Sequence, residues 1–452
     1  MTTKIDKSVP TVGVVSLGCS KNRVNTEQMM YLLRQAGYFV TGETDSVDAV
    51  LLNTCGFIES AKSEAFEFIH EFIAAKKESR IGKLVVAGCL PERYKNEIIR
   101  ELPEIDAVVG TGSFDDIVDV FKALQKGMPD QARHDGLQQP LERFGDINAP
   151  VSETGRIIST SPVWAYLKIA EGCDNHCAYC CIPAIRGRYR SRPVEKIVEE
   201  AKKLVGSGIQ ELIIVAQDVT RYKRLPELLS ALDRIDGLKW IRLHYMYPDG
   251  FTDELIDVIA KSDKILKYLD IPIQHINNGI LKKMNRRGTK EDITKLFKRL
   301  RESIPGVVLR TSLITGLPGE GIDEFNELCD FIREMKIERI GVFAYSPEDG
   351  TPAASMERPS KKTAEKRADK LLDLQSQIMF NWNKSRIGSV VTVLMEDDQY
   401  ARSFAESPDI DGVILVKTKK GESVRFSKCL VSEAMDVRIT GIENGQLAGE
   451  IY

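Results

Sequence analysis

Cysteine is the residue type whose spacing in this sequence points most clearly to chemistry. Four of the nine cysteines lie within nine residues of one another, and three more are spread over the first ninety residues. The chain begins without an apolar export signal, so we expect a reducing, cytoplasmic environment. In such a compartment, cysteine clusters usually bind metals or carry out redox chemistry, whereas disulfides are rare.

Cys19, Cys55 and Cys89 each follow a short, apolar, β-branched segment. These segments, VGVVSLG, DAVLLNT and KLVVAG, are typical of buried parallel strands. A helical pattern follows each of them, at residues 25–35, 59–77 and 92–100. Because ligands bind beyond the carboxyl ends of such strands, the three thiols could converge on one object. An iron–sulfur cluster with one open iron would fit, as would a zinc site with an open position; the alternative is three buried structural cysteines.

A second group of thiols lies in the segment EGCDNHCAYCCIPAIRGRYRSR, where Cys173, Cys177 and Cys180 form a CxxxCxxC pattern. Three closely spaced thiolates suit a [4Fe–4S] cluster that leaves one iron free. Zinc sites usually pair two CxxC-type knuckles, and no second knuckle follows here. We expect the adjacent Cys181 to be a bystander. Cys329 and Cys429 are expected to be structural.

The CxxxCxxC pattern with an aromatic residue, Tyr179, before its last cysteine resembles the signature of the radical S-adenosylmethionine enzymes. Together with the three earlier cysteines, it makes nearly the whole chain similar to the methylthiotransferases. The resemblance implies that Cys173, Cys177 and Cys180 bind a [4Fe–4S] cluster whose open iron holds S-adenosylmethionine. It also implies a second [4Fe–4S] cluster on Cys19, Cys55 and Cys89, and an electron donor such as flavodoxin or ferredoxin.

The helices and strands expected from the sequence, which must position these residues, indicate an α/β protein in three parts. Residues 10–125 predict an open parallel α/β sheet domain, and 126–158 read as a linker without periodicity. In residues 159–383 six strands alternate with helices, which predicts a parallel, partly open barrel of the radical S-adenosylmethionine type. Residues 384–452 contain short β-rich pieces separated by turn residues, which predict a small antiparallel barrel similar to a TRAM domain.

Further candidate binding residues follow from the barrel and from the resemblance. Gln217 and Asp218 come directly after the strand-like segment ELIIVA, so they should point into the barrel mouth, near S-adenosylmethionine. A loop-capping role is the alternative for both. Tyr179 should pack beside the adenine, and a plain hydrophobic contact is its alternative. Arg186, Arg188, Arg190 and Arg192 alternate, which places them on one face if the segment is extended.

The local strings NTCGFIESAK, VAQDVTRY and AYSPEDGTPAA resemble the branch of the family that modifies ribosomal protein uS12. That branch methylthiolates the β-carbon of an aspartate, using two molecules of S-adenosylmethionine. The sister branch, which acts on a modified adenosine in tRNA, is the alternative. A third possibility, from another class, is a non-catalytic iron–sulfur or zinc protein that binds the ribosome.

Charge and hydropathy narrow the choice of partners. The net charge of −3, from 63 basic and 66 acidic residues, excludes a protein that holds nucleic acid by bulk charge. Residues 385–452 carry 8 basic and 11 acidic residues, which suits a basic protein such as uS12 better than tRNA. No apolar run approaches the roughly 18 residues that span a bilayer, so we expect no membrane partner.

Overall fold

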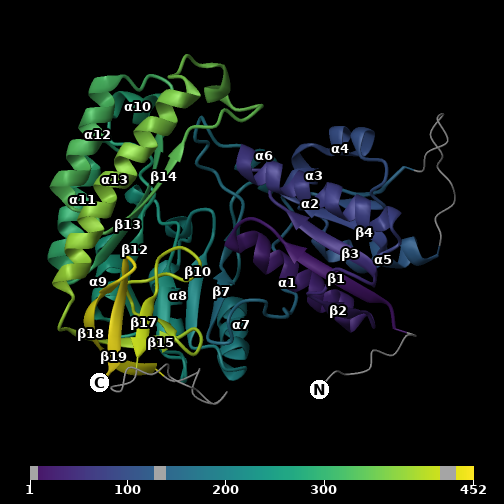
Figure 1. Ribbon diagram of the computed structural model, residues 1–452, viewed down its shortest axis with the longest axis horizontal. Helices are drawn as coiled ribbons and strands as arrows, with labels where there is room; N and C mark the ends of the chain where they lie inside the picture. Colours follow the sequence, from purple (N-terminus) through teal and green to yellow (C-terminus); the bar gives the residue numbers. More distant parts are fainter. Residues whose placement is uncertain (1–8, 127–138, 418–433) are drawn as a thin grey trace.

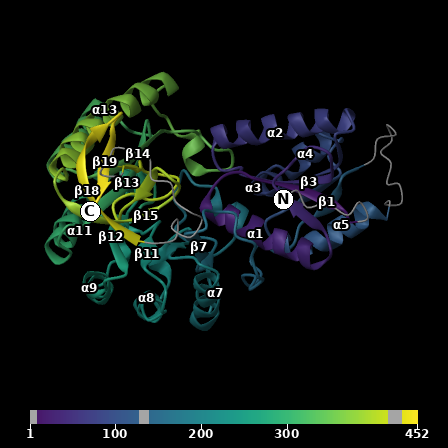
Figure 2. The ribbon, with the colours of Figure 1, turned by 60° about the horizontal axis from the view of Figure 1, so that its bottom comes forward.

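The computed structural model describes residues 9–126, 139–417 and 434–452. Figure 1 shows two α/β units side by side, with a small β-barrel packed against the larger unit. Figure 2, turned by 60°, shows the same division: the N-terminal sheet and its helices on one side, and a curved sheet surrounded by helices on the other. Within the described residues no helix is long and apolar enough to cross a membrane.

Six parallel strands form the N-terminal sheet, in the order β2-β1-β3-β4-β5-β6. These strands are β1 (Thr11–Ser16), β2 (Phe39–Thr41), β3 (Val47–Thr54), β4 (Ile81–Gly88), β5 (Ala107–Val109) and β6 (Leu141–Arg143). Alternate residues of β3 and β4 belong to two separate apolar clusters, one on each face. Burial on both faces explains why these strands read as continuous apolar runs in the sequence.

Helices cover both faces of this sheet. They are α1 (Ser20–Gln35), α2 (Glu59–Lys77), α3 (Cys89–Arg93), α4 (Lys95–Glu101) and α5 (Ile117–Gln125). The helical pattern at 59–77 is confirmed at both ends, whereas the single helix expected at 92–100 is two short helices. The first of these starts directly at Cys89, because Gly88 with its φ of 105° lets the chain turn sharply out of β4.

The segment expected to be a linker, residues 126–158, contains one strand of the sheet. Leu141–Arg143 forms β6 and pairs in parallel with β5 at the edge of the N-terminal sheet. The segment predicted to be a linker therefore also contributes an edge strand to the N-terminal sheet. Three residues carry too little alternation to be distinguished from a loop, and the pairing with β5 supplies the missing stabilisation.

The second unit is a six-stranded parallel sheet curved into an open barrel, in the order β14-β13-β12-β11-β10-β7. Its strands are β7 (Trp164–Lys168), β10 (Glu211–Val215), β11 (Trp240–Leu243), β12 (Ile265–Asp270), β13 (Val308–Thr315) and β14 (Arg339–Ala344). Its helices are α7 (Val194–Gly206), α8 (Leu225–Asp233), α9 (Asp253–Lys261), α10 (Asn278–Lys283), α11 (Lys290–Ser303), α12 (Ile322–Met335) and α13 (Lys361–Ser385). The expected partly open β/α barrel is thereby confirmed.

A short irregular region follows β7 before the first long helix of the barrel. The two-residue strands β8 (Ala170–Glu171) and β9 (Arg190–Ser191) pair antiparallel. Between them lie the cysteine-rich loop and the short helix α6 (Ile182–Arg186). This region therefore stands at the carboxyl end of β7, which is the end where parallel barrels carry their sites.

The C-terminal strands close into a small barrel, in the order β15-β16-β17-β19-β18. They are β15 (Val390–Met395), β16 (Tyr400–Arg402), β17 (Ile414–Lys417), β18 (Ala434–Glu443) and β19 (Gln446–Ile451). All the pairings are antiparallel except that of β17 with β19. The expected small barrel is confirmed, and this single parallel pairing closes it.

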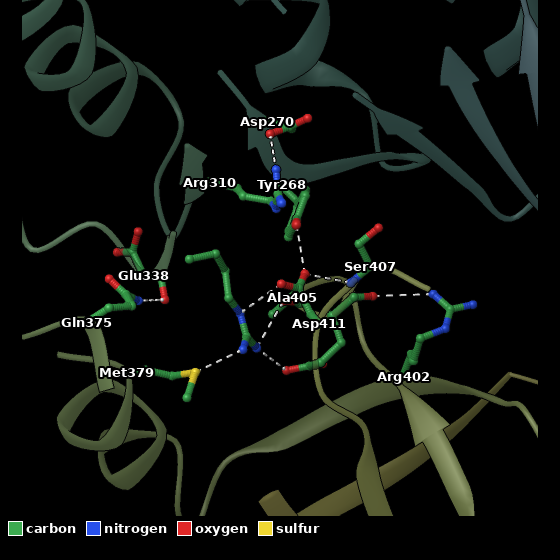
Figure 3. A network of polar contacts seen from close by, with 12 residues as sticks. Tyr268, Asp270, Arg310, Glu338, Gln375, Met379, Arg402, Ala405, Ser407 and Asp411 are labelled. Atoms are coloured by element: carbon green, nitrogen blue, oxygen red, sulfur yellow. Dashed lines mark hydrogen bonds and ion pairs between the residues drawn. The ribbon is translucent and has the colours of Figure 1, made fainter. Parts of the chain in front are cut away.

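The last residue of β16 and the connection that follows it, residues 402–411, fasten the small barrel to the large one through buried polar contacts (Figure 3). Glu211, at the start of β10, pairs with Arg242 at 2.6 Å and with Arg402 at 2.8 Å. The Tyr268 hydroxyl donates to Asp411 at 2.7 Å. Because Glu211 opens its strand, this connection covers the amino-terminal end of the large barrel, opposite the cysteine-rich loop.

Glu406 has a central place in this attachment. Its carboxylate pairs with Arg339, the first residue of β14, at 3.1 Å, and with Arg386 at 2.5 Å. Burial alone would raise the pKa of Glu406, but the guanidinium groups of Arg386 and Arg339 lower it to about 2. The ionised carboxylate therefore stabilises the folded state at neutral pH.

We expect Glu406→Gln to lower the free energy of unfolding by about 3 kcal/mol at pH 7, because it leaves two buried guanidinium groups without their acid. The native pKa lies below the unfolded one, so this contribution is full above about pH 4.5 and fades as the pH falls towards 2. Urea unfolding at pH 7 and pH 4 measures both effects, and the difference from the unmodified protein should be smaller at pH 4. Asp257→Asn, in the exposed pair with Lys261, is the control and should change little.

Candidate functional site

The three early thiols lie together at the carboxyl edge of the N-terminal sheet. Cys55 and Cys89 directly follow β3 and β4, and Cys19 precedes α1, just after β1. These strands are neighbours in the order β1-β3-β4, so their carboxyl ends meet at one edge. Gly18, with a φ of 88°, makes the approach possible, because a Cβ there would lie 2.6 Å from the Cβ of Cys55.

The electrostatic surroundings of these thiols are uneven. Burial raises the pKa of Cys55 to about 12, and the neighbouring Cys89 and Cys19 add to the shift. Burial alone would also raise the pKa of Cys19, but the charges of Lys21 and Arg186 bring it below its usual value. Arg186 also donates to the Cys89 sulfur, with Nη2 3.1 Å from Sγ. The first thiol is therefore the one most readily ionised.

The second set of thiols occupies the loop between β8 and α6. Within it, the backbone N–H of Cys180 donates to the carbonyl of Cys177 at 3.0 Å, and the N–H of Ile182 points at the Cys180 sulfur at 3.5 Å. The Arg286 guanidinium lies 3.8 Å from the Cys177 sulfur. All three thiols of the CxxxCxxC pattern are partly exposed. Cys177 and Cys180 line a cavity of about 410 Å³ that also borders Arg93 and Pro352.

Both sets of thiols fit iron–sulfur clusters by the chemistry of their donors. Each offers three cysteines and N–H or guanidinium groups directed at sulfur, which are the contacts that stabilise anionic clusters. Among the described residues, no group of three or more His, Cys, Asp or Glu side chains converges closely enough to hold a single metal ion.

Arg186 connects the two sets of thiols. It ends α6, which follows the CxxxCxxC loop, and its guanidinium is 97% buried at the boundary between the two α/β units. Besides Cys89, it contacts Asn25 Oδ1 at 2.8 Å, Asn22 Oδ1 at 3.0 Å and Glu171 Oε2 at 3.3 Å. One side chain therefore joins helix α1 and a thiol of the N-terminal sheet to the end of the large barrel.

The polar residues expected at the barrel mouth are both there, and both contact other protein groups. Gln217 donates to Glu171 Oε1 at 2.7 Å, while its own carbonyl oxygen is buried without a hydrogen-bond partner among the described residues. Asp218 accepts from Asn175 of the cysteine loop at 2.8 Å and from Thr220 at 2.6 Å. Gln217 thus has a free acceptor for a ligand, whereas the carboxylate of Asp218 holds the loop.

Tyr179 belongs to the cysteine loop, where it stands between Cys177 and Cys180. Its hydroxyl accepts a hydrogen bond from Arg286 at 2.9 Å, and its ring packs on a cluster that includes Met284 and Leu317. The pKa of Tyr179 is raised, first because the hydroxyl is buried. The ring therefore lies beside the CxxxCxxC thiols in an apolar setting.

The alternating arginines do not share a face, because the segment is not extended throughout. Arg186 ends a helix, whereas Arg190 lies in β9. Arg192 is buried and pairs with Glu153 and Glu200, so it is structural. The condition for a shared arginine face, an extended segment, is not met, because Arg186 is the last residue of α6 and only Arg190 and Ser191 form a strand.

Three residues of the site were not predicted from the sequence: Glu171, Lys168 and Arg286. Glu171 pairs with Lys168 at 3.0 Å and with Arg186, and these two cations hold the pKa of its carboxyl far below the usual value although burial opposes them. The sequence offers only positional signals for two of them. Glu171 lies beside the cysteine loop, and Arg286 lies within the string MNRRGT.

The remaining cysteines are Cys181, Cys329 and Cys429. Cys181 is buried beside Cys89 and Ile185, and burial raises its pKa to about 11. Cys329 is buried on α12. Cys429 lies outside the described residues.

An open parallel barrel with a CxxxCxxC loop at the carboxyl end of its first strand defines a radical S-adenosylmethionine enzyme. Residues 167–332 match the radical SAM superfamily, residues 11–110 match a family described as uncharacterized protein family UPF0004, and residues 387–451 match the TRAM domain. Membership of this superfamily gives the chain S-adenosylmethionine and a [4Fe–4S] cluster as cofactors.

Full-length relatives identify the family within that class. The ribosomal protein uS12 methylthiotransferase RimO of Thermoanaerobacter sp. (strain X514) is 42% identical, over 95% of this chain and 99% of its own. The RimO of Caldanaerobacter subterraneus subsp. tengcongensis is 44% identical, over 90% and 94%. The chain belongs to this family of radical S-adenosylmethionine methylthiotransferases.

Solved structures agree on the fold. The radical S-adenosylmethionine methyltransferase TsrM from Kitasatospora setae, solved with cobalamin and a [4Fe–4S] cluster, has a TM-score of 0.57 at 16% identity, over 76% of this chain and 77% of its own. The cobalamin-dependent enzyme OxsB has a TM-score of 0.52 at 14% identity, over 81% and 56%. At such low identities the similarity concerns the arrangement of strands and helices alone.

In iron-free protein, we expect iodoacetamide to label Cys19 about tenfold faster than Cys55 at pH 7, because the thiolate is the reactive form and only Cys19 has a lowered pKa. Peptide mass spectrometry after timed quenching measures both rates. Arg186→Met should shift the pH midpoint for labelling Cys19 upwards, since it removes a nearby positive charge. Cys329 on α12 serves as the internal control, and an unchanged midpoint in the variant would contradict the assignment.

Proposed function

We propose that this protein methylthiolates the β-carbon of an aspartate side chain in ribosomal protein uS12. The observation that carries the proposal is the full-length similarity to enzymes named for that substrate, at 42–44% identity. The hydrogen bond from Arg186, which ends the helix after the CxxxCxxC loop, to the Cys89 sulfur supports it, because sulfur transfer to carbon needs a sulfur-holding site near a radical-generating one.

We further propose that the protein carries two [4Fe–4S] clusters, one on each triad. Cys173, Cys177 and Cys180 would hold the cluster that binds S-adenosylmethionine, with Tyr179 and Gln217 beside it. Cys19, Cys55 and Cys89 would hold the other cluster, and these three thiols are the second set. The hydrogen bond from Arg186 to Cys89 and the charge of Lys21 support an anionic group at the second set.

The target bond explains why such cofactors are needed. An aliphatic C–H has no proton that a side-chain base could remove at neutral pH, and the cofactors supply a carbon radical that can abstract the hydrogen atom. The chain's own residues bind and orient. Asp218 holds the cysteine loop through Asn175, and Arg286 holds Tyr179 through its hydroxyl. Arg186 links the helix that follows the CxxxCxxC loop to Cys89.

The division of labour follows the three parts of the chain. We propose residues 10–125 as the sulfur-holding domain, 126–158 as a connection, 159–383 as the radical-generating domain and 384–452 as a docking barrel. The acidic balance of residues 385–452 supports docking of a basic protein rather than tRNA. The cavity beside Cys177 and Cys180 offers an approach for an electron donor such as flavodoxin or ferredoxin in the cytoplasm.

The direct test compares uS12 from host cells with and without this gene. We expect an aspartate-bearing peptide of uS12 to lose the mass of one methylthio group in the deletion strain, and to regain it when the gene is restored. Peptide mass spectrometry measures the change, and a plasmid with Cys173→Ala is the control that should not restore it. If uS12 is unchanged while a methylthiolated tRNA nucleoside disappears, the substrate proposal is wrong.

Two clusters predict a definite iron content. The reconstituted protein should hold about eight iron atoms, and alanine at Cys19, Cys55 and Cys89 together should remove about four of them. Alanine at the other triad should remove a similar amount. Iron and sulfide analysis of anaerobically purified protein measures both. Full iron content after loss of the first triad would contradict the second cluster.

A further inference from the structure

Lys21 is an exception among the buried cations of the described residues. Its side chain lies in the first turn of α1, and the residue is only 8% exposed. Every other buried lysine or arginine in the described part of the chain pairs with a carboxylate at 3.3 Å or less; these are Lys168, Arg186, Arg192, Arg242, Arg339, Arg386 and Arg402. Lys21 has no carboxylate within ion-pair distance among the described residues. The anion that it faces within the chain is the Cys19 thiolate, whose pKa its charge lowers. No carboxylate of the described residues neutralises it, which leaves the ammonium open to a further anion.

The contact that Lys21 does make is with an aromatic ring of the other α/β unit. Its Nζ lies 3.3 Å from the ring centroid of Tyr245, which follows β11. The Tyr245 hydroxyl lies 3.4 Å from Ser20 Oγ. A cation over a ring face gains less than an ion pair with a carboxylate, so this contact leaves the ammonium able to bind an anion as well.

Tyr245 adopts a backbone conformation that is rare for a bulky residue. Its φ is 56°, and its N–H donates to Asp270 Oδ2 at 3.0 Å. Such strain persists only where the surroundings hold it, and it is concentrated at functional sites. Here it accompanies the position of the ring against Lys21 at the carboxyl end of the barrel strands.

Lys21 therefore lies between the N-terminal thiols and the barrel interior. It is two residues after Cys19, and three residues further along α1 Val24 packs on Trp164 and Ile213, which belong to β7 and β10.

We infer that Lys21 binds the carboxylate of the substrate aspartate, and that Tyr245 holds the lysine side chain in place for it. This inference rests on the proposed function, in which the reacting carbon is directly bonded to that carboxylate. Anchoring the carboxylate beside Cys19 places its β-carbon next to the N-terminal thiols. The ammonium thus selects aspartate over asparagine, because a charged hydrogen-bond pair is stronger than one to a neutral amide.

The test measures binding of uS12 to the reconstituted enzyme without reductant, so that no turnover occurs. Two forms of uS12 are compared: the natural protein, and one with asparagine in place of the modified aspartate. We expect the unmodified enzyme to prefer aspartate by about 10- to 100-fold in Kd, and Lys21→Met to reduce that preference to about one. Lys203→Met, an exposed lysine of α7 paired with Glu199, is the matched control and should retain the full preference.

Measurements of iron content and of methylthiolation distinguish a loss of substrate binding from a loss of the cluster. Lys21→Met should keep its iron and lose most methylthiolation of uS12. Should it lose iron, Lys21→Gln is the second variant, and its preference for aspartate must fall likewise. An iron-loaded variant at position 21 that still prefers aspartate as strongly as the unmodified enzyme would overturn the inference. An unmodified enzyme that methylthiolates uS12 but binds both forms equally would also overturn the inference, whereas an enzyme that does not modify uS12 at all would place the failure with the proposed function.

Discussion

A single buried guanidinium, that of Arg186, holds together the parts of this protein that must act on one another. It contacts the sulfur of Cys89, the amide oxygens of Asn22 and Asn25, and the carboxylate of Glu171. These partners come from both α/β units. Because a buried charge is tolerated only when its hydrogen-bonding groups are matched, the relative position of the two units is constrained to a narrow range.

That constraint explains why the N-terminal unit does more than present three thiols. Helix α1 carries Cys19 at its start, Lys21 in its first turn and Val24 against the inner face of the large barrel. The helix therefore covers barrel residues and lines the path to the thiols. Movement of one unit would expose apolar barrel residues and separate the ammonium of Lys21 from Tyr245.

The two ends of the large barrel differ in how their buried polar groups are paired. At the amino-terminal end, Glu211 and Glu406 form ion pairs with buried arginines, and residues of the small barrel take part in these pairs. At the carboxyl end, the Gln217 carbonyl lacks a hydrogen-bond partner among the described residues and Lys21 lacks a carboxylate. Ion pairs hold the first end against the small barrel, whereas the unpartnered groups at the second end are ones that a ligand can complete.

The sequence by itself determined the elements and the chemistry of the thiols. The helix expected at 59–77 matches α2 at both ends, because apolar periodicity is a local property. The CxxxCxxC spacing named the enzyme class for the same reason. Only the tertiary structure decided that Arg186 reaches Cys89, that β6 completes the first sheet and that Lys21 faces Tyr245, 224 positions further along the chain. Such contacts follow from how whole units pack, and no local pattern of residues encodes a partner so distant in sequence.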